Sequence, residues 1–363
     1  MDRVHCPSHV QFLTLELYLF FSFVLDIIRP KRVLKLNKIG SKMLIDSFGR
    51  TVDYIRISVT NRCNFRCQYC MPDTPEDFFD AEEDIPLAQL LELVKVAIDE
   101  GVKKIRITGG EPMIRKDLDW FIAQIYLYNP EIDIALTTNG FYLRHFAKSL
   151  KEAGLKRINV SLDSLKPERV ALISKKNVLP QILEGIDLAL SVGLIVKLNM
   201  VPLKGVNEDE IPDLIAFAQS KKVTIRFIEF MENSHAKEGA TGLRQKEILE
   251  RVAERFSYKK IEKEFFGPAT LYELEGGGKF GIIAPHNDDF CESCNRVRIS
   301  SDGKIIPCLY FEDAVDAKEA MEKGDREGIR RALLQAVTNK PEKNEWREED
   351  NKTSGRAFYQ TGG

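Results

Sequence analysis

Short apolar runs rich in β-branched residues alternate with longer amphipathic stretches from residue 54 onward. The runs predict six strands, at residues 54–59, 104–108, 133–138, 157–162, 195–201 and 223–230. Helical spacing of the apolar residues between them predicts helices near residues 86–100, 117–128, 141–153, 179–192 and 209–220. A repeated strand–helix order indicates parallel strands joined by right-handed crossovers.

Six such units are two short of a closed (β/α)8 barrel, so we expect an α/β fold with an open, partial (β/α)6 TIM-like barrel over residues 43–238. The pattern changes after about residue 240. Helical stretches then mix with short strands and a hairpin whose turn is Ser-Asp-Gly. We therefore expect a smaller C-terminal α+β domain over residues 239–363. Functional groups in such barrels gather at the C-terminal ends of the strands.

The first 42 residues do not share this pattern. Residues 10–28 are apolar and long enough to cross a bilayer, but Glu16 and Asp26 interrupt them at a high cost in lipid. No small-residue cleavage site follows, which argues against a secretory signal. We expect residues 1–42 to be an extension outside the fold, with a membrane anchor as the alternative.

Composition narrows the class of protein. The formal net charge of −2 over 363 residues shows no basic excess, so the sequence does not indicate a nucleic-acid partner. Six of the seven cysteines fall into two tight groups, which favours metal binding in a reducing compartment over a disulfide scaffold. We expect a cytoplasmic protein that does not bind membranes.

The first cysteine group follows the first predicted strand. Cys63, Cys67 and Cys70 have three and then two residues between them, and no fourth ligand lies nearby. Thiolates select zinc, copper(I) or iron–sulfur clusters. Three protein ligands on a [4Fe–4S] cluster would leave one iron open to a small molecule, much as a catalytic zinc keeps an open position. A structural zinc site is the alternative.

This spacing, with an aromatic residue before the last cysteine, resembles the signature of the radical S-adenosylmethionine (SAM) superfamily. In that superfamily the open iron chelates the methionine part of SAM, and reductive cleavage gives a 5′-deoxyadenosyl radical. Gly109, Gly110 and Glu111 follow the second strand and resemble the Gly-Gly-Glu-Pro motif that binds the SAM amino group. Glycine permits close approach of a ligand to the backbone, and a carboxylate suits an ammonium group.

A second group is formed by Cys291, Cys294 and Cys308. Arg296 and Arg298 alternate on one predicted strand, so both face the same side and suit a phosphate ligand. A zinc ribbon completed by His286 is the alternative reading of the cysteines alone.

Together, the two cysteine groups and the Asn-Arg-Val-Arg-Ile-Ser-Ser-Asp-Gly segment resemble the GTP 3′,8-cyclase (MoaA) family of molybdenum cofactor biosynthesis over roughly residues 43–363. The resemblance implies two [4Fe–4S] clusters, SAM as cofactor and GTP as substrate, with guanine on the second cluster. It implies SAM contacts at Tyr69, Gly109, Gly110, Glu111, Ser161 and Met231. It implies GTP contacts at Arg56, Lys104, Arg106, Thr137, Lys197, Arg296, Val297 and Arg298.

The resemblance further implies a catalytic role for Arg226 and for the terminal Gly362 and Gly363, which would reach into the active site. Basic residues in buried strands are costly unless an anion pairs with them, which agrees with a triphosphate ligand. The radical would abstract the C3′ hydrogen of GTP, and the ribose radical would attack C8 of guanine.

The implied partners are an electron donor such as flavodoxin or ferredoxin and, downstream, cyclic pyranopterin monophosphate synthase. The expected state is a monomer or homodimer. Two other functions remain open at this point: a radical SAM peptide-modifying enzyme with an auxiliary cluster, and a zinc-stabilised protein without enzymatic activity.

Overall fold

The core of the fold is a run of parallel strands in sequence order. A computed structural model describes residues 43–71, 84–233, 235–262, 267–287, 289–343 and 357–361. The six predicted strands are β1 (Tyr54–Ser58), β2 (Lys104–Thr108), β3 (Asp133–Thr138), β4 (Arg157–Ser161), β5 (Ile195–Met200) and β6 (Thr224–Ile228). Each pairs in parallel with the next, as the strand–helix alternation predicted.

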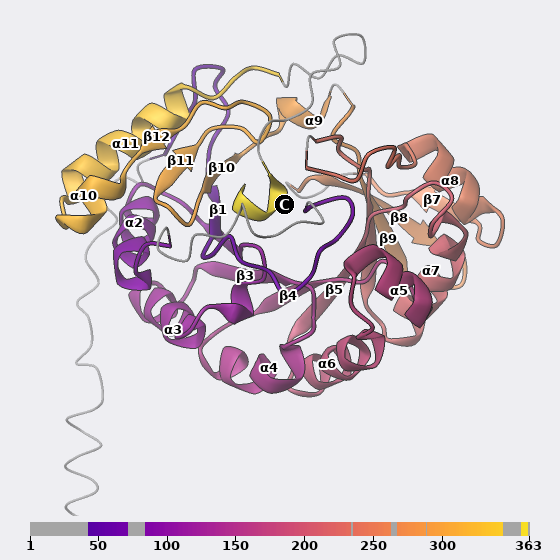
Figure 1. Cartoon of the computed structure of the whole chain (residues 1–363). Helices are drawn as coiled ribbons and strands as arrows, with labels where there is room; N and C mark the ends of the chain where they lie inside the picture. The colour runs from indigo at the N-terminus through magenta and orange to yellow at the C-terminus, as the bar shows by residue number, and fades with distance from the viewer. Residues whose placement is uncertain are drawn as a thin grey trace, which may run out of the picture. The chain divides into compact units, whose positions relative to one another are not determined.

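Helices cover the outer face of this sheet (Figure 1). They are α2 (Leu87–Asp99), α3 (Leu118–Tyr128), α4 (Leu143–Glu152), α5 (Pro167–Ser174), α6 (Leu179–Ser191) and α7 (Ile211–Ser220). All but α5 were predicted; α5 and the short 3-10 helices Pro112–Ile114 and Glu208–Glu210 lie in stretches too short for a periodic signal. No described helix is both long and apolar enough to cross a membrane.

The C-terminal part of the chain extends the same sheet at both edges. On one side β10 (Arg296–Ile299) pairs in parallel with β1 and is followed by β11 (Lys304–Ile306) and β12 (Val315–Asp316). On the other side β9 (Lys279–Ile283) pairs in parallel with β6 and is followed by β8 (Ala269–Leu274) and β7 (Tyr258–Lys260). Within the described residues β12 and β7 end the strand order, so the sheet is open, as expected.

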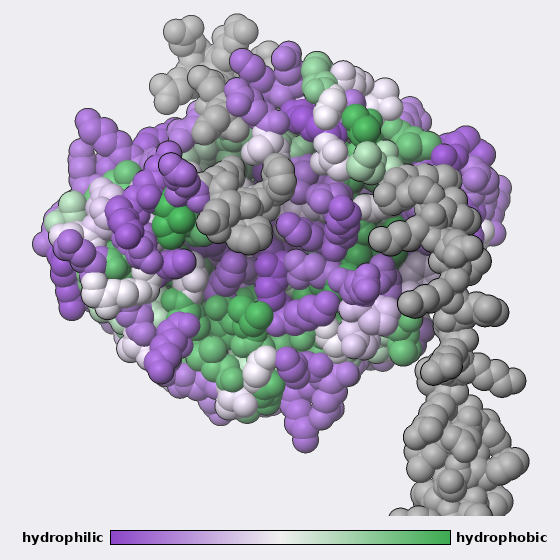
Figure 2. Space-filling model, turned by 180° about the vertical axis from the view of Figure 1, so that it is seen from behind, coloured by the Kyte–Doolittle hydropathy of each residue, from purple (hydrophilic) through white to green (hydrophobic). Residues whose placement is uncertain are grey.

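The helices of this part are α8 (Gln245–Ala253), α9 (Asp289–Glu292), α10 (Lys318–Glu322), α11 (Arg326–Thr338) and α12 (Phe358–Thr361). Figure 1 shows the short α12 at the middle of the curved sheet, beside β1. Seen from behind, hydrophilic side chains cover most of the surface, with hydrophobic side chains gathered in patches between them (Figure 2). The boundary near residue 238 and the extension at residues 1–42, which lies outside the described residues, stay predictions.

Side-chain alternation along the strands separates the core from the inner face of the sheet. Ile55 and Ile57 on β1 are fully buried in the main hydrophobic cluster, together with their neighbours on β2 and β10. Successive side chains of a strand point to opposite faces, so Tyr54, Arg56 and Ser58 face the other way, into the curved interior. The same alternation on the other parallel strands places polar side chains of these strands on the inner face.

Candidate functional site

A row of arginines crosses three neighbouring strands on the inner face. Arg56 on β1 is in register with Arg106 on β2 and with Arg298 on β10. Like charges directly opposite each other on a sheet are destabilising, and burial adds a desolvation cost. The Nε of Arg106 is buried without a hydrogen-bond partner, and its Nη1 donates only a long hydrogen bond, 3.4 Å, to Thr137 Oγ1. Such a row fits an anionic ligand.

The pKa values on this face report the same excess of positive charge. Burial raises the pKa of the Tyr54 phenol, but the nearby arginines, led by Arg106, overcome this and hold it at about 8. Burial, together with Arg298, lowers the pKa of Arg56 well below its usual range. Burial lowers the pKa of Arg298 to about 10, and Arg296 adds to that shift.

The opposite wall carries two more cations. Arg226 on β6 is 9% exposed and donates hydrogen bonds to the amide oxygens of Asn159 (2.6 Å) and Asn199 (2.7 Å). In the part of the chain that the structure describes, no carboxylate forms an ion pair with it. Burial lowers its pKa to about 9, and burial with the neighbouring arginines lowers the pKa of Lys197 to about 8. The predicted GTP contacts Arg56, Arg106, Lys197 and Arg298 therefore share this inner face with Arg226.

Two predicted GTP contacts, Val297 and Lys104, do not lie in the arginine row. Val297 lies between the arginines of β10, so its side chain points to the other face and is fully buried in the core. A nucleotide contact by Val297 is therefore open only to its backbone. Lys104 is in register with Tyr54 one step below the arginine row and is half-buried.

The first cysteine group lines a pocket next to these cations. The predicted SAM residues in its lining are Tyr69, Gly109, Gly110, Ser161 and Met231, together with all three cysteines. The lining also contains residues that the sequence did not single out: Asn139, Asp163, Asn199, Glu229 and Phe358. Asp163 accepts a hydrogen bond of 2.8 Å from the Tyr69 hydroxyl, and burial raises its pKa to about 6.

The three cysteines are partly buried in the lining of one pocket, and Cys63 and Cys70 receive hydrogen bonds from backbone or side-chain groups. Burial raises the pKa of Cys63 and of Cys70 to about 12, with smaller contributions from neighbouring acidic groups and thiols. The N–H of Phe65 and the Nδ2 of Asn139 donate to Cys63 Sγ at 3.4 and 3.8 Å. Among the described residues no group of three or more His, Cys, Asp or Glu could hold a single metal ion. The features that favour an iron–sulfur cluster at this site are therefore the three thiol donors, their spacing in the sequence and the N–H groups directed at them.

Gly109 and Gly110 let the loop after β2 lie against the cysteine loop. A Cβ on Gly109 would stand 2.5 Å from the carbonyl oxygen of Thr60, and one on Gly110 would overlap the carbonyl of Arg62. The neighbouring Glu111 is fully buried, and its carboxylate accepts hydrogen bonds from Thr138 Oγ1 and from the N–H of Asn139 and Met113. Glu111 thus holds the loops together, and its contact with the SAM ammonium stays a prediction.

A buried lysine that the sequence did not indicate lies beside the second cysteine group. Lys340 is 3% exposed, and its Nζ lies 3.6 Å from Cys294 Sγ. Burial raises the pKa of Cys294, but Arg296 and Lys340 overcome this and lower it to about 6. His286 does not complete a zinc ribbon here, because its two ring nitrogens contact Glu229 and Glu232.

Residues 357–361, close to the C-terminus, lie at the site. Ala357, Phe358, Tyr359 and Thr361 are buried, and Phe358 lines the pocket of the first cysteine group. The backbone N–H of Tyr359 donates to Cys70, and the carbonyl oxygen of Thr361 accepts a hydrogen bond of 3.2 Å from Arg298. Gly362 and Gly363 lie outside the described residues, so their catalytic role stays a prediction.

The fold and the cysteine-lined pocket define a radical SAM enzyme, and residues 57–218 match the family model for the Radical SAM superfamily. Residues 223–346 match the model for Molybdenum Cofactor Synthesis C. GTP 3′,8-cyclase of Helicobacter pylori (strain J99 / ATCC 700824) is 58% identical over 321 residues, which cover 88% of this chain and 100% of the relative. That of Campylobacter curvus (strain 525.92) is 55% identical over 322 residues, with the same coverage. The chain therefore belongs to the GTP 3′,8-cyclase family.

Solved structures support the fold. Streptococcus suis SuiB bound to S-adenosylmethionine aligns with a TM-score of 0.56 at 13% identity, over 97% of this chain and 75% of that one. SuiB bound to its precursor peptide SuiA aligns with a TM-score of 0.59 at 17% identity, over 97% and 76%. Native anSMEcpe with bound AdoMet gives 0.53 at 14% identity, over 85% and 88%. At these identities the likeness extends to the fold alone.

Proposed function

We propose that this enzyme converts GTP to (8S)-3′,8-cyclo-7,8-dihydroguanosine 5′-triphosphate in the first step of molybdenum cofactor biosynthesis, with 5′-deoxyadenosine and methionine as co-products. One observation supports the choice of substrate: Arg298, Arg56 and Arg106 form a row on the inner face, on β10, β1 and β2. Cys294 lies just before β10 and Cys63 just after β1, so this row is on strands that adjoin both cysteine groups. A peptide-modifying enzyme would have no need of such a concentration of buried cations. A triphosphate requires several charge-assisted hydrogen bonds at one place.

Two [4Fe–4S] clusters would be held by the thiolates of Cys63, Cys67 and Cys70 and of Cys291, Cys294 and Cys308. The first cluster, when bound, supplies the electron for cleavage of SAM, and the second offers an open iron to guanine. These assignments are supported by the partly buried thiols, by the N–H groups directed at Cys63 and Cys70, and by Lys340 beside Cys294.

The remaining residues act by position and charge. Arg56, Arg106 and Arg298 neutralise the triphosphate and fix the nucleotide along the strand row. Tyr69, Ser161 and Met231 line the pocket that would hold SAM next to it. Arg226 and Lys197 would face the ribose, and the tail contacts the arginine row through the hydrogen bond from Arg298 to the carbonyl oxygen of Thr361. A nucleotide held in this way would have its ribose C3′ on the side of the SAM pocket.

The deciding experiment is anaerobic incubation of the reconstituted protein with SAM, a low-potential reductant and GTP. We expect 5′-deoxyadenosine and a GTP-derived product in equal amounts. The absence of both from protein with full iron content would refute the proposal, and zinc without iron after anaerobic purification would favour a zinc-stabilised structural protein. A flavodoxin or ferredoxin as electron donor, cyclic pyranopterin monophosphate synthase as the next enzyme, a monomeric or homodimeric state and a cytoplasmic location stay predictions.

A further inference from the structure

His286 contacts two carboxylates that flank the wall of the SAM pocket. Its Nδ1 lies 2.8 Å from Glu229 Oε2, and its Nε2 lies 3.2 Å from Glu232 Oε2. Glu229 and Glu232 belong to the segment that leaves β6, and Met231 between them lines the SAM pocket. One imidazole ring thus holds both ends of a four-residue stretch of that wall.

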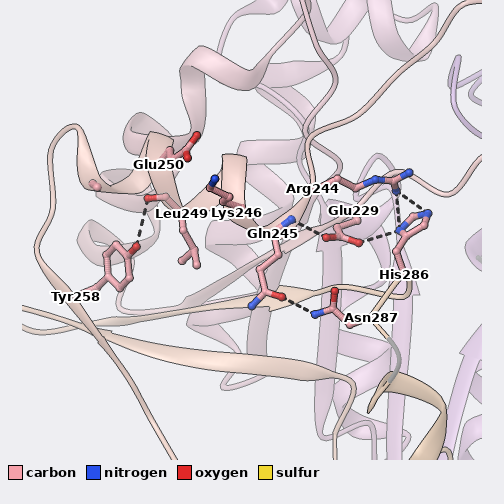
Figure 3. A pocket seen from close by; sticks show the side chains of 10 residues that line it. Glu229, Arg244, Gln245, Lys246, Leu249, Glu250, Tyr258, His286 and Asn287 are labelled. Atoms are coloured by element: carbon pink, nitrogen blue, oxygen red, sulfur yellow. Dashed lines mark hydrogen bonds and ion pairs between the residues drawn. The ribbon is translucent and has the colours of Figure 1, made fainter. Parts of the chain in front are cut away.

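Figure 3 shows Glu229, Arg244 and His286 pointing toward one another at one end of an outer pocket. Arg244 precedes α8, and its Nη2 forms an ion pair with Glu232 at 3.1 Å. Its Nη1 lies 2.7 Å from Nδ1 and 2.6 Å from Nε2 of His286 (Figure 3). The backbone N–H of Gln245 donates to the other oxygen of Glu229 at 2.6 Å. Two carboxylates then face one guanidinium and one imidazole, so the cluster is neutral when His286 is protonated. Lys246 and Glu250 of α8 line the same pocket.

Glu229 belongs to both cavities. It is 2% exposed and lines the outer pocket as well as the SAM pocket. His286 lies on the segment after β9 that leads to Cys291, the first cysteine of the second group. A hydrogen-bonded link therefore runs from the segment that carries the second cysteine group to the wall of the first.

We propose that His286 is a positioning residue that fixes the Glu229–Glu232 wall, so that SAM affinity depends on its contacts with both carboxylates. This inference rests on the proposed function, because it requires SAM in the pocket of the first cysteine group. The imidazolium form donates to both carboxylates. The neutral ring donates to one carboxylate only, and its other nitrogen is left to accept a hydrogen bond from Arg244 Nη1, so one carboxylate loses its contact with the ring. The Glu229–Glu232 wall then keeps only one of its two contacts with His286.

The pH dependence follows from the surroundings of the ring. Burial alone would lower the pKa of His286, but hydrogen bonds with Glu229 and Glu232 outweigh burial and the opposing charge of Arg244, and raise it above 6.5. The doubly donating form is thus fully present below pH 6.5 and is lost as the pH rises through the raised pKa. SAM affinity is expected to fall over that range.

The test is the dissociation constant for SAM of the anaerobically reconstituted full chain between pH 6 and 9, measured by equilibrium dialysis with labelled SAM and by the electron paramagnetic resonance change of the reduced cluster. We expect wild type to lose about tenfold in affinity across this range, since one charge-assisted hydrogen bond is worth roughly that factor. His286→Gln should bind about tenfold more weakly at pH 6 and lose the part of the pH dependence that His286 contributes, so that only the part from Asp163, whose pKa is raised by burial to about 6, remains. His286→Lys, which keeps a cation, should recover most of the affinity without the contribution of His286 to the pH dependence.

His145→Gln, an exposed histidine on α4, is the matched control and should behave as wild type. A His286→Gln protein that binds SAM with wild-type affinity and pH dependence would overturn the inference while leaving the proposed function standing. Failure of wild type to bind SAM at all would instead remove the proposed function. If His286→Gln does not fold, Glu232→Gln removes one of the two contacts from the other side and must weaken SAM binding in the same way.

Discussion

The Nζ of Lys340 lies 3.6 Å from Cys294 Sγ and also donates to the carbonyl oxygens of Arg296, at 2.8 Å, and Pro307, at 3.3 Å. Pro307 directly precedes Cys308. One buried ammonium therefore bridges the two segments that carry Cys294 and Cys308. A buried lysine is costly unless it is paired, so a thiolate at Cys294 is the partner that this arrangement favours.

Lys340→Met should selectively impair the second cluster. The methionine keeps the volume of the side chain but removes the bonds to both segments and the cation next to Cys294. We expect iron content after reconstitution to fall from about eight to about four per chain, since each [4Fe–4S] cluster holds four. Iron analysis and Mössbauer spectroscopy measure this, and SAM cleavage without GTP should persist. Lys318→Met, an exposed control on α10, should keep all its iron; equal iron in both variants would contradict the role.

In the absence of a ligand, the row of three neighbouring arginines should lower the free energy of unfolding of the protein. Arg106→Met removes one of three neighbouring charges and an unpartnered buried Nε. The melting temperature of the ligand-free protein should therefore stay level or rise by about 2–4 °C, which corresponds to roughly 1 kcal/mol. GTP should bind about 10- to 100-fold more weakly, because a charge-assisted contact is lost.

Thermal unfolding with and without GTP separates the two effects. Wild type should gain stability from GTP and Arg106→Met should gain little. Arg255→Met removes an exposed arginine that is paired with Asp213, and it should leave the response to GTP unchanged. A ligand-free Arg106→Met protein that unfolds several degrees below wild type would show that the row is stabilising on its own.

GTP binding should take up protons near pH 8. The pKa of Lys197 is lowered to about 8, chiefly by burial and then by nearby arginines, and that of Tyr54 is lowered to about 8 by the arginines against the effect of burial. A bound triphosphate offsets the arginine charges, so both pKa values rise and both groups bind protons. Isothermal titration calorimetry at pH 8 in two buffers of different ionisation enthalpy measures the uptake. Proton release would contradict the assignment of this face to the phosphates.

The same two pKa shifts determine whether the stability of the ligand-free protein rises or falls with pH. Both folded pKa values lie below their unfolded values of 10.5 and 10.0, so the unfolded chain binds more protons between about pH 8 and 10.5. These two groups therefore add stability as the pH rises through that window, and the contribution is lost as the pH falls through about 8. Lys197→Met should reduce this pH dependence in denaturant titrations at pH 7.5 and 9.5.

Local patterns predicted the residues of the site better than their arrangement. The spacing of Cys63, Cys67 and Cys70 and the alternation of Arg296 and Arg298 are local signals, and both were read correctly as lying at strand ends and on one face. The pairing of β10 with β1 brings together residues about 240 positions apart, which no local period encodes. Lys340 was missed for the same reason, because its sequence neighbours do not indicate that its side chain is buried against Cys294. The sequence indicated a ligand contact for Glu111 from its charge and motif, and that contact stays a prediction. What no local pattern indicated is that its carboxylate also accepts hydrogen bonds from Thr138 at the end of β3, from Asn139 after it and from Met113.

Gly110→Ala should separate the two loops that build the SAM pocket. The added Cβ would overlap the carbonyl group of Arg62, and backbone cannot move aside as the end of a flexible side chain can. Overpacking of this kind costs about 2–3 kcal/mol, and the hydrogen bond from the Gly110 N–H to Thr60 O, now 2.8 Å, would lengthen. We expect lower thermal stability together with at least tenfold weaker SAM binding. Gly267→Ala meets no atom within 4 Å and is the matched control. If Gly110→Ala binds SAM as tightly as this control, the close contact between the loops is not what shapes the pocket.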